Sequence, residues 1–111
     1  MTVRPTRWYS DKQEKQVAKA VGGRKTANSG ATRFSKGDVT NDQWLIECKT
    51  VEKEQETFTV RKEWIEKNAQ ESFAMRKPYN AVAFSFGDGV NHYIISEKLF
   101  KQLVNYLEED R

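Results

Sequence analysis

Residues 37–49 read GDVTNDQWLIECK, and this stretch decides the fold. Residues 44–49 are mostly apolar or β-favouring, which predicts a strand, and the turn-forming residues 40–43 before them predict a hairpin. Asp38 then stands near the end of the first hairpin strand, and Glu47 stands on the second. Because antiparallel strands place residues opposite one another, the two carboxylates are able to converge on one point.

Alternation along the second strand separates its charged side chains from its apolar ones. Glu47 and Lys49 point to one face of the sheet, whereas Trp44, Ile46 and Cys48 point to the other. The charges follow an apolar run that predicts a strand entering the core, where an unpaired charge is costly. Buried charges in this position indicate a functional role.

Three helices and two more strands are expected around the hairpin. Ser10 and Gln13 form an S-x-x-Q capping box, which predicts a first helix over residues 11–21 that ends at the glycine pair 22–23. Residues 24–38 are rich in small polar residues without a period, which is typical of a loop. The remaining elements are a helix over residues 59–76 stopped by Pro78, strands over residues 81–86 and 92–96, and a last helix capped by Ser96.

Apolar residues recur at helical spacing in the two later helices. In the second helix they are Val60, Trp64, Ile65, Ala69 and Phe73, and in the last helix Leu99, Phe100, Leu103, Val104 and Leu107 are expected to form the buried face. Glu63, Glu66 and Glu71 beside Lys62 and Lys67 indicate an ordinary mixed-charge surface. We therefore expect a single α/β domain over residues 1–111, with a mixed central sheet flanked by helices in the order α-β-β-α-β-β-α.

Charge is distributed unevenly along the chain. Residues 1–36 hold nine Lys or Arg and two acidic residues, although the whole chain carries a net charge of only +3. A basic segment suits contact with a polyanion, because each neutralised phosphate releases condensed counterions. Nucleic acid is therefore the expected class of partner, and residues 1–9 are expected to form a flexible basic arm.

Composition also excludes several classes of protein. Apolar runs such as residues 81–86 are far shorter than the roughly 20 residues that cross a bilayer, and no apolar stretch follows the basic start. These features predict no membrane contact and a cytoplasmic location, in a host cell if the chain is viral. The single Cys48 builds neither an internal disulfide nor a thiolate metal cluster.

Asp38, Glu47 and Lys49 together suit phosphodiester hydrolysis. This reaction needs a hard cation that polarises the phosphate and lowers the pKa of a water. Mg²⁺ commonly binds through one or two carboxylates, which matches Asp38 and Glu47. Lys49 shares the face and is able to hold the attacking water and contact the scissile phosphate.

The motif formed by Asp38, eight intervening residues and Glu47-Cys48-Lys49 resembles the signature of the PD-(D/E)XK nuclease superfamily. Gly37 replaces the proline of the superfamily name. Together with Glu14 and the loop 29–31, the motif from Asp38 to Lys49 is similar to that of the Holliday junction resolvases of archaea and their phages. The resemblance covers roughly residues 10–50 and implies a restriction-endonuclease-like fold.

The resemblance also implies roles for individual residues. Glu14, Asp38 and Glu47 would ligate Mg²⁺ or Mn²⁺, Lys49 would assist the attacking water, and Ser29 would belong to a catalytic loop. The residues expected to contact phosphates are Arg24, Lys25, Arg33 and Lys36. A homodimer would place two such sites symmetrically on a four-way junction, with each cut leaving a 5′-phosphate.

Other functions remain open from the residues alone. One alternative is a nicking or restriction-type endonuclease of the same superfamily that acts on linear or flapped DNA, and another is a DNA-binding module that does not cleave. An enzyme acting on RNA would share the phosphate chemistry. Glu14 also has an ordinary alternative role as a surface residue paired with nearby lysines.

Overall fold

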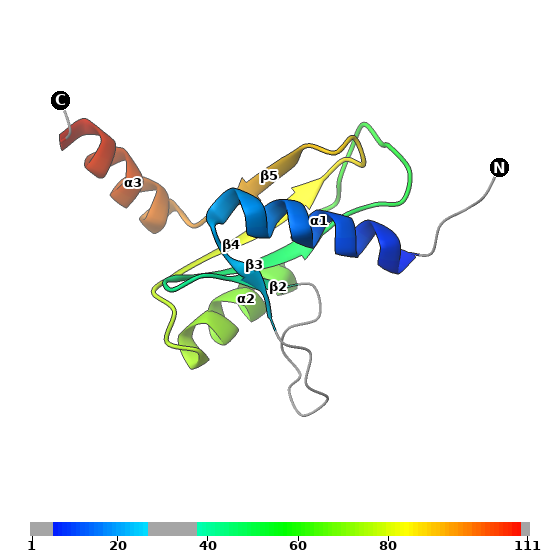
Figure 1. Cartoon of the computed structure of the whole chain (residues 1–111). Coiled ribbons are helices and arrows are strands. Elements are labelled where there is room, and N and C mark those ends of the chain that lie inside the picture. The colour runs from blue at the N-terminus through cyan, green and yellow to red at the C-terminus, as the bar shows by residue number, and fades with distance from the viewer. Residues whose placement is uncertain (1–5, 27–37, 110–111) are drawn as a thin grey trace.

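The computed structural model describes residues 6–26 and 38–109, which form an α/β domain built on one mixed sheet (Figure 1). The elements in chain order are α1 (Thr6–Val21), β1 (Arg24–Lys25), β2 (Asp38–Thr40), β3 (Trp44–Lys49), α2 (Lys62–Ala74), β4 (Tyr79–Ser85), β5 (Asn91–Ile94) and α3 (Glu97–Glu109). The α/β class and the mixed sheet are confirmed. The element order differs from expectation by the short strand β1, which lies in a segment expected to be loop.

The sheet has the strand order β1-β2-β3-β4-β5. The first three strands form an antiparallel meander, and the predicted hairpin is its second half, with Asp38 opposite Glu47 and Thr40 opposite Leu45. β4 then pairs parallel to β3, which requires a crossover, and α2 provides it. The strand that carries Glu47 and Lys49 is therefore central, with a partner strand on each side.

α1 and α2 cover opposite faces of this sheet (Figure 1). The side facing α1 holds the main apolar core, which consists of Val17, Val39, Ile46, Ala81 and Ala83. Ala18, Trp44 and Cys48 pack against that core, as the strand alternation predicts. The opposite side of β3 faces α2.

The end of α1 agrees with the sequence prediction, but its beginning does not. Gly22 ends the helix with a φ of 63°, and a Cβ on Gly23 would collide with the carbonyl oxygen of Thr40. The helix begins at Thr6, so Ser10 lies inside it and the expected cap at Ser10 is wrong. Residues 6–9 of the expected basic arm are helical, and residues 1–5 lie outside the described residues.

The apolar stripe of α2 does not form its buried side. Its buried residues are Asn68, Glu71 and Ser72, whereas Phe73 is 86% exposed and Ile65 is 39% exposed. The side of the sheet that α2 covers carries Glu47 and Lys49, so the polar side of the helix turns inward to meet them.

α3 differs from expectation in a similar way. The cap is confirmed, because Ser96 Oγ accepts a hydrogen bond from the Leu99 amide at 3.1 Å. Of the five apolar residues expected to be buried, however, only Leu99 is buried. α3 projects away from the sheet in Figure 1, and no described helix is long and apolar enough to cross a membrane.

Candidate active site

The hairpin brings Asp38 and Glu47 together as direct partners across β2 and β3. Side chains of directly opposed antiparallel residues lie on the same face of a sheet. Asp38 is 3% exposed and Glu47 is 5% exposed, so two carboxylates are withdrawn from water at neighbouring positions. Lys49 is two residues further along β3 and shares their face.

Lys49 lies against α2. Its Nζ atom is 4.6 Å from the centroid of the Trp64 ring, a cation–π distance that also identifies the face to which β3 turns its charged side chains. Asn68 Nδ2, one turn further along α2, donates a hydrogen bond to the Leu45 carbonyl at 3.4 Å and ties the helix to the strand. The candidate site therefore lies between β3 and α2.

The buried Glu47 carboxylate has one oxygen without a hydrogen bond in the described part of the protein. Burial raises the pKa of its carboxyl group, Lys49 and Lys67 oppose that rise, and Glu71 adds to it. Its Oε2 atom is buried and has no hydrogen-bond partner among the described residues. A buried carboxylate in this state costs free energy that a bound cation would offset.

Glu71 belongs to the same charged group, although the sequence indicated a surface position. It is 4% exposed, burial raises the pKa of its carboxyl group, and Lys67 and Lys49 oppose that rise. Its Oε2 atom likewise has no hydrogen-bond partner among residues 6–26 and 38–109. Asn68, Glu71 and Ser72 share one side of α2 at helical spacing, but that spacing does not show that this polar side is the one that is covered.

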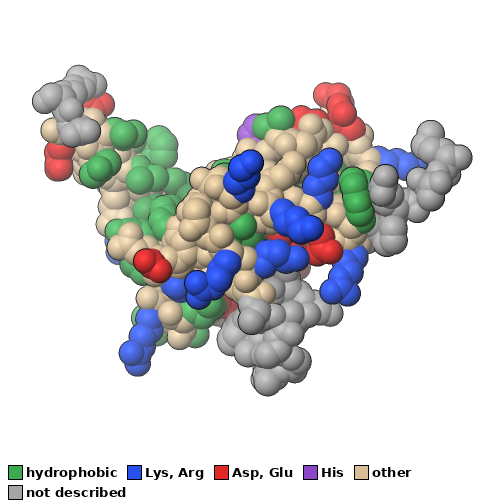
Figure 2. Space-filling view, viewed as in Figure 1, with side chains coloured by type: hydrophobic (Ala, Val, Ile, Leu, Met, Phe, Trp, Pro, Cys, Tyr) green, Lys and Arg blue, Asp and Glu red, His purple; other side chains and the backbone are tan. Residues whose placement is uncertain are grey.

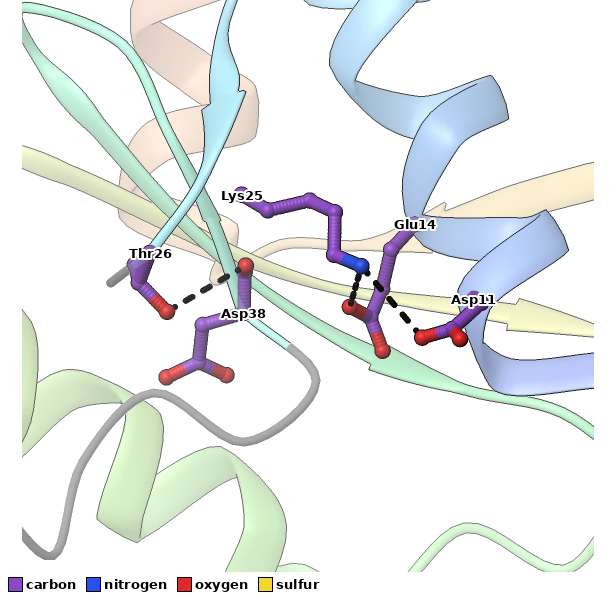
Figure 3. A network of polar contacts seen from close by, with 5 residues as sticks. All are labelled: Asp11, Glu14, Lys25, Thr26 and Asp38. Carbon is purple, nitrogen blue, oxygen red and sulfur yellow. Dashed lines mark hydrogen bonds and ion pairs between the residues drawn. The ribbon is translucent and has the colours of Figure 1, made fainter. Parts of the chain in front are cut away.

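Glu14 is placed on α1 in a separate network of polar contacts (Figure 3). Lys25 Nζ lies 3.6 Å from Glu14 Oε1 and 3.3 Å from Asp11 Oδ1. Burial raises the pKa of the Glu14 carboxyl group, while the adjacent Lys25 lowers it. Figure 3 shows the Asp38 carboxylate lying apart from these contacts, while the Asp38 backbone carbonyl accepts a hydrogen bond from the Thr26 hydroxyl.

Gln13, next to Glu14 on α1, connects that helix to β3. Its Nε2 atom donates to the Lys49 carbonyl at 2.7 Å and to Asn91 Oδ1 at 3.1 Å. The side chain is 3% exposed, so this contact is part of the interior. It fixes the backbone of Lys49 from the side opposite α2, a role that the sequence did not reveal.

The expected phosphate contacts are only partly described. Arg24 is exposed on β1, whereas Lys25 already pairs with two carboxylates. Ser29, Arg33 and Lys36 lie outside the described residues. Figure 2 shows Lys and Arg side chains gathered over α1 and β1, where the exposed basic residues are Arg7, Lys12, Lys15, Lys19, Arg24 and Lys25.

The residues fit a hard divalent cation in donor type. Asp38 and Glu47 supply carboxylate oxygens, and the unsatisfied Glu47 Oε2 provides a position that a cation would complete. Among residues 6–26 and 38–109, no three His, Cys, Asp or Glu side chains already converge as a metal-binding group. Mg²⁺ is usually coordinated by one or two carboxylates, with water and substrate phosphate as its other ligands, and two carboxylates match this coordination.

Comparison with known proteins adds no identification to this geometry. No family model matches the chain, and no curated protein and no solved structure matches it either.

Proposed function

We propose that this chain is a metal-dependent endodeoxyribonuclease that hydrolyses phosphodiester bonds in branched DNA. The observation that carries the proposal is the pairing of Asp38 with Glu47 across the hairpin, with Lys49 on the same face of β3. The meander β1-β2-β3 followed by a helical crossover to parallel β4 supports the restriction-endonuclease-like fold that the sequence motif implies.

In this proposal, Asp38 and Glu47 hold Mg²⁺ or Mn²⁺. When bound, the cation polarises the phosphate and makes a water more acidic. Lys49 donates a hydrogen bond to the attacking water and offsets negative charge that builds up on the phosphate oxygens. Trp64 fixes the direction of the Lys49 ammonium, and the exposed basic residues of α1 and β1 hold the DNA backbone.

Glu14 enters this scheme less directly than the motif implies. Its contact with Lys25 leaves it beside the Asp38–Glu47 pair rather than within it. Phosphate binding by Lys25 would release Glu14 from its ion pair, and the carboxylate would then be available to the metal. Glu14 is therefore proposed as a ligand that joins only when DNA is bound.

The proposed substrate is the four-way junction, cut by a homodimer. Two identical sites related by a two-fold axis match two like strands of a junction. A nuclease acting on linear or flapped DNA would use the same three residues. Comparing the cleavage of a junction with the cleavage of other DNA substrates therefore separates the two kinds of nuclease.

A DNA-binding module that does not cleave is the second candidate. It is favoured by one observation, that no three potential ligands converge among the described residues. The basic surface over α1 and β1 would serve binding equally well.

The deciding experiment incubates the purified chain with a labelled immobile four-way junction and a linear duplex of the same arms, in Mg²⁺ or in EDTA. Symmetric nicks near the branch point that need Mg²⁺ are expected. Lys49→Ala and Asp38→Asn should abolish them, whereas the exposed counterparts Lys62→Ala and Asp42→Asn should cut normally. Retained binding with no cleavage of either substrate would replace the nuclease with the binding module.

A further inference from the structure

A small pocket with polar and aromatic walls lies beside the N-terminal half of α1. The residues that line it include Trp8, Tyr9, Lys12, Gln13, Thr50 and Ser85. Its volume of about 100 Å³ is comparable to that of a cavity of about 150 Å³ that holds one benzene molecule. The pocket therefore has room for one planar ring but not for a base pair.

The pocket lies where two parallel strands end. Thr50 follows β3, and Ser85 is the last residue of β4, which pairs parallel to β3. Figure 1 shows the N-terminal half of α1 over these strand ends. In open α/β sheets, ligands bind in the crevice outside the carboxyl ends of the strands. The place of the pocket in the fold therefore favours a binding site.

Two buried polar side chains line this pocket. Gln13 is 3% exposed and Ser85 is 4% exposed. The Gln13 amide donates to the Lys49 carbonyl and to Asn91 Oδ1, but its Oε1 atom accepts no hydrogen bond in the described part of the chain. Ser85 Oγ accepts a hydrogen bond from the Gly87 amide at 3.0 Å, which leaves the hydroxyl proton to donate. An occupant that carries both a donor and an acceptor therefore suits the pocket.

Trp8 forms a partly exposed aromatic wall of the pocket. Its side chain is 37% exposed, and the Tyr9 ring meets it edge-on at a centroid distance of 5.0 Å. Lys12 Nζ lies over the Trp8 ring, 5.2 Å from its centroid. An aromatic face of this kind stacks on any nucleobase, and the lysine beside it is placed to contact the attached phosphate.

A stripe of lysines runs along α1 from this aromatic wall. Trp8, Lys12, Lys15 and Lys19 follow the i, i+4, i+7, i+11 spacing of one side of a helix, and all four are exposed. Figure 2 shows the positive charge gathered over α1. Proteins hold single-stranded nucleic acid with a basic track for the phosphates and aromatic rings for the bases. A free anion would use the charges but not the ring, so the occupant favoured here is a base attached to a strand.

The pocket adjoins the proposed chemical centre. Thr50 directly follows Lys49 in the chain, and Gln13 Nε2 donates to the Lys49 carbonyl at 2.7 Å. A nucleotide whose base sits in the pocket would therefore lie near the phosphate that Lys49 contacts.

We propose that this pocket binds one unpaired base of the DNA strand whose phosphates lie along α1. The base stacks on Trp8, its polar edge meets Gln13 and Ser85, and Lys12 moves from the ring to the neighbouring phosphate. The inference rests on DNA as the partner in the proposed function, but not on cleavage. It makes unpaired nucleotides near the cut, such as those at an opened branch point, the feature that the protein recognises.

The test compares the binding of two labelled oligomers of equal length to the full chain, by fluorescence anisotropy in EDTA. One oligomer is oligothymidylate, and the other carries the same phosphates on abasic tetrahydrofuran sugars. The wild type is expected to bind oligothymidylate about 10-fold more tightly than the abasic oligomer. Trp8→Ala should lose most of this ratio, and Trp8→Phe should keep most of it because the aromatic face remains.

Two control variants separate the pocket from the charge around it. Lys15→Ala should weaken the binding of both oligomers about equally, because Lys15 lies on the basic stripe but does not line the pocket. Tyr106→Ala removes an exposed aromatic ring from α3 and should change neither affinity. Circular dichroism and thermal unfolding of each variant check that the domain remains folded.

Photo-crosslinking locates the bound base. An oligothymidylate with a single 5-iodouracil, irradiated in complex with the full chain, should label the peptide that contains Trp8 and Tyr9 in mass spectrometry. Labelling confined to Trp64 or Phe84, which both contact Phe58 and lie outside the pocket, would overturn the proposal.

A wild-type chain that fails to bind oligothymidylate, or binds both oligomers equally, also overturns the proposal, as does a ratio that survives in Trp8→Ala. These outcomes are separate from those of the cleavage assay. A chain that distinguishes the two oligomers but never cuts DNA would disprove the nuclease and leave the base pocket standing. A chain that cuts junctions but binds both oligomers equally would do the reverse.

Discussion

The Nζ atom of Lys49 lies 4.6 Å from the centroid of the Trp64 ring, so a residue of the crossover helix α2 contacts the lysine of the β3 motif. A ring face attracts a cation through its quadrupole and does so more strongly where water is partly excluded. Both residues are half-buried. The contact therefore restricts the direction of the Lys49 side chain.

Replacement of Trp64 should reveal this positioning role. Trp64→Leu removes the ring face and is expected to lower the rate of junction cleavage about 5-fold, whereas Trp64→Phe should stay within about 2-fold of wild type. Single-turnover rates across a pH series are the measurement, with urea unfolding of each variant as the control. Equal rates for both variants, with stability preserved, would show that the ring does not position Lys49.

Burial of Glu47 and Glu71 predicts a pH dependence of stability. Burial raises the pKa of both carboxyl groups, so the folded chain binds these protons more tightly than the unfolded chain. The stability that they contribute is complete below the ordinary glutamate pKa of 4.5 and is lost as pH rises through the raised values. At neutral pH both charges therefore destabilise the metal-free protein.

The double variant Glu47→Gln/Glu71→Gln should accordingly be more stable than wild type at neutral pH, by about 1 to 3 kcal/mol, and the gain should vanish towards pH 4.5. Urea unfolding in EDTA at several pH values measures this difference. Glu66→Gln, an exposed position on α2, is the matched control and should change little. Parallel stability profiles for wild type and double variant would contradict the prediction.

Divalent cation should stabilise the wild type through the same carboxylates. A ligand at ten times its dissociation constant stabilises the folded state by about 1.4 kcal/mol, which raises the melting temperature by about 4 °C or more in a domain of this size. We expect this shift with Mg²⁺ or Mn²⁺ and expect Glu47→Gln to lose it. Asp42→Asn, in the exposed turn of the hairpin, should keep it. A shift that persists in Glu47→Gln would place the cation elsewhere.

Cys48 should be chemically inert in the folded protein. It packs against the α1 side of the core, and burial raises the pKa of its thiol, as do the carboxylates of Glu14, Asp38 and Glu47. Only the thiolate reacts rapidly, so we expect labelling by a thiol reagent near pH 8 to be roughly 100-fold slower in buffer than in denaturing urea. Rapid stoichiometric labelling of the native chain would contradict the burial of Cys48.

The hairpin was predictable from the sequence because two independent signals coincide there. The two-residue period of strand side chains fixes the face of Glu47 and Lys49, and the turn before Trp44 fixes their pairing with Asp38. A slip of one residue would turn Ile46 out of the core and the charges into it. The sequence therefore specified this register strongly, and the structure agrees.

The faces of α2 and α3 were not predictable in the same way. Helical periodicity shows which residues share a side, but not whether that side is covered. Phe73 and Leu107 each belong to an apolar stripe that faces outward. The burial of Glu71 depends on the charged side of β3 lying beneath α2, a tertiary relationship that no local pattern encodes.

Glu14 illustrates a further limit. The motif groups it with Asp38 and Glu47, but its partner in the structure is Lys25. Lys25 lies on β1, a strand of two residues that is too short to be recognised from the sequence. The ion pair between Lys25 and Glu14, which competes with metal binding by Glu14, is therefore visible only once the strand order is known.

The central position of β3 has a consequence for how the protein moves. Glu47 has a partner strand on both sides, with Asp38 in β2 and Val82 in β4 as its neighbours in register. Amide protons in such a strand exchange with deuterated solvent mainly when the whole domain opens, whereas those near chain ends and loops exchange through local fluctuations. We therefore expect the proposed chemical centre to belong to the slowest-exchanging part of the molecule, so that adaptation to the shape of a substrate would come from the elements that surround it.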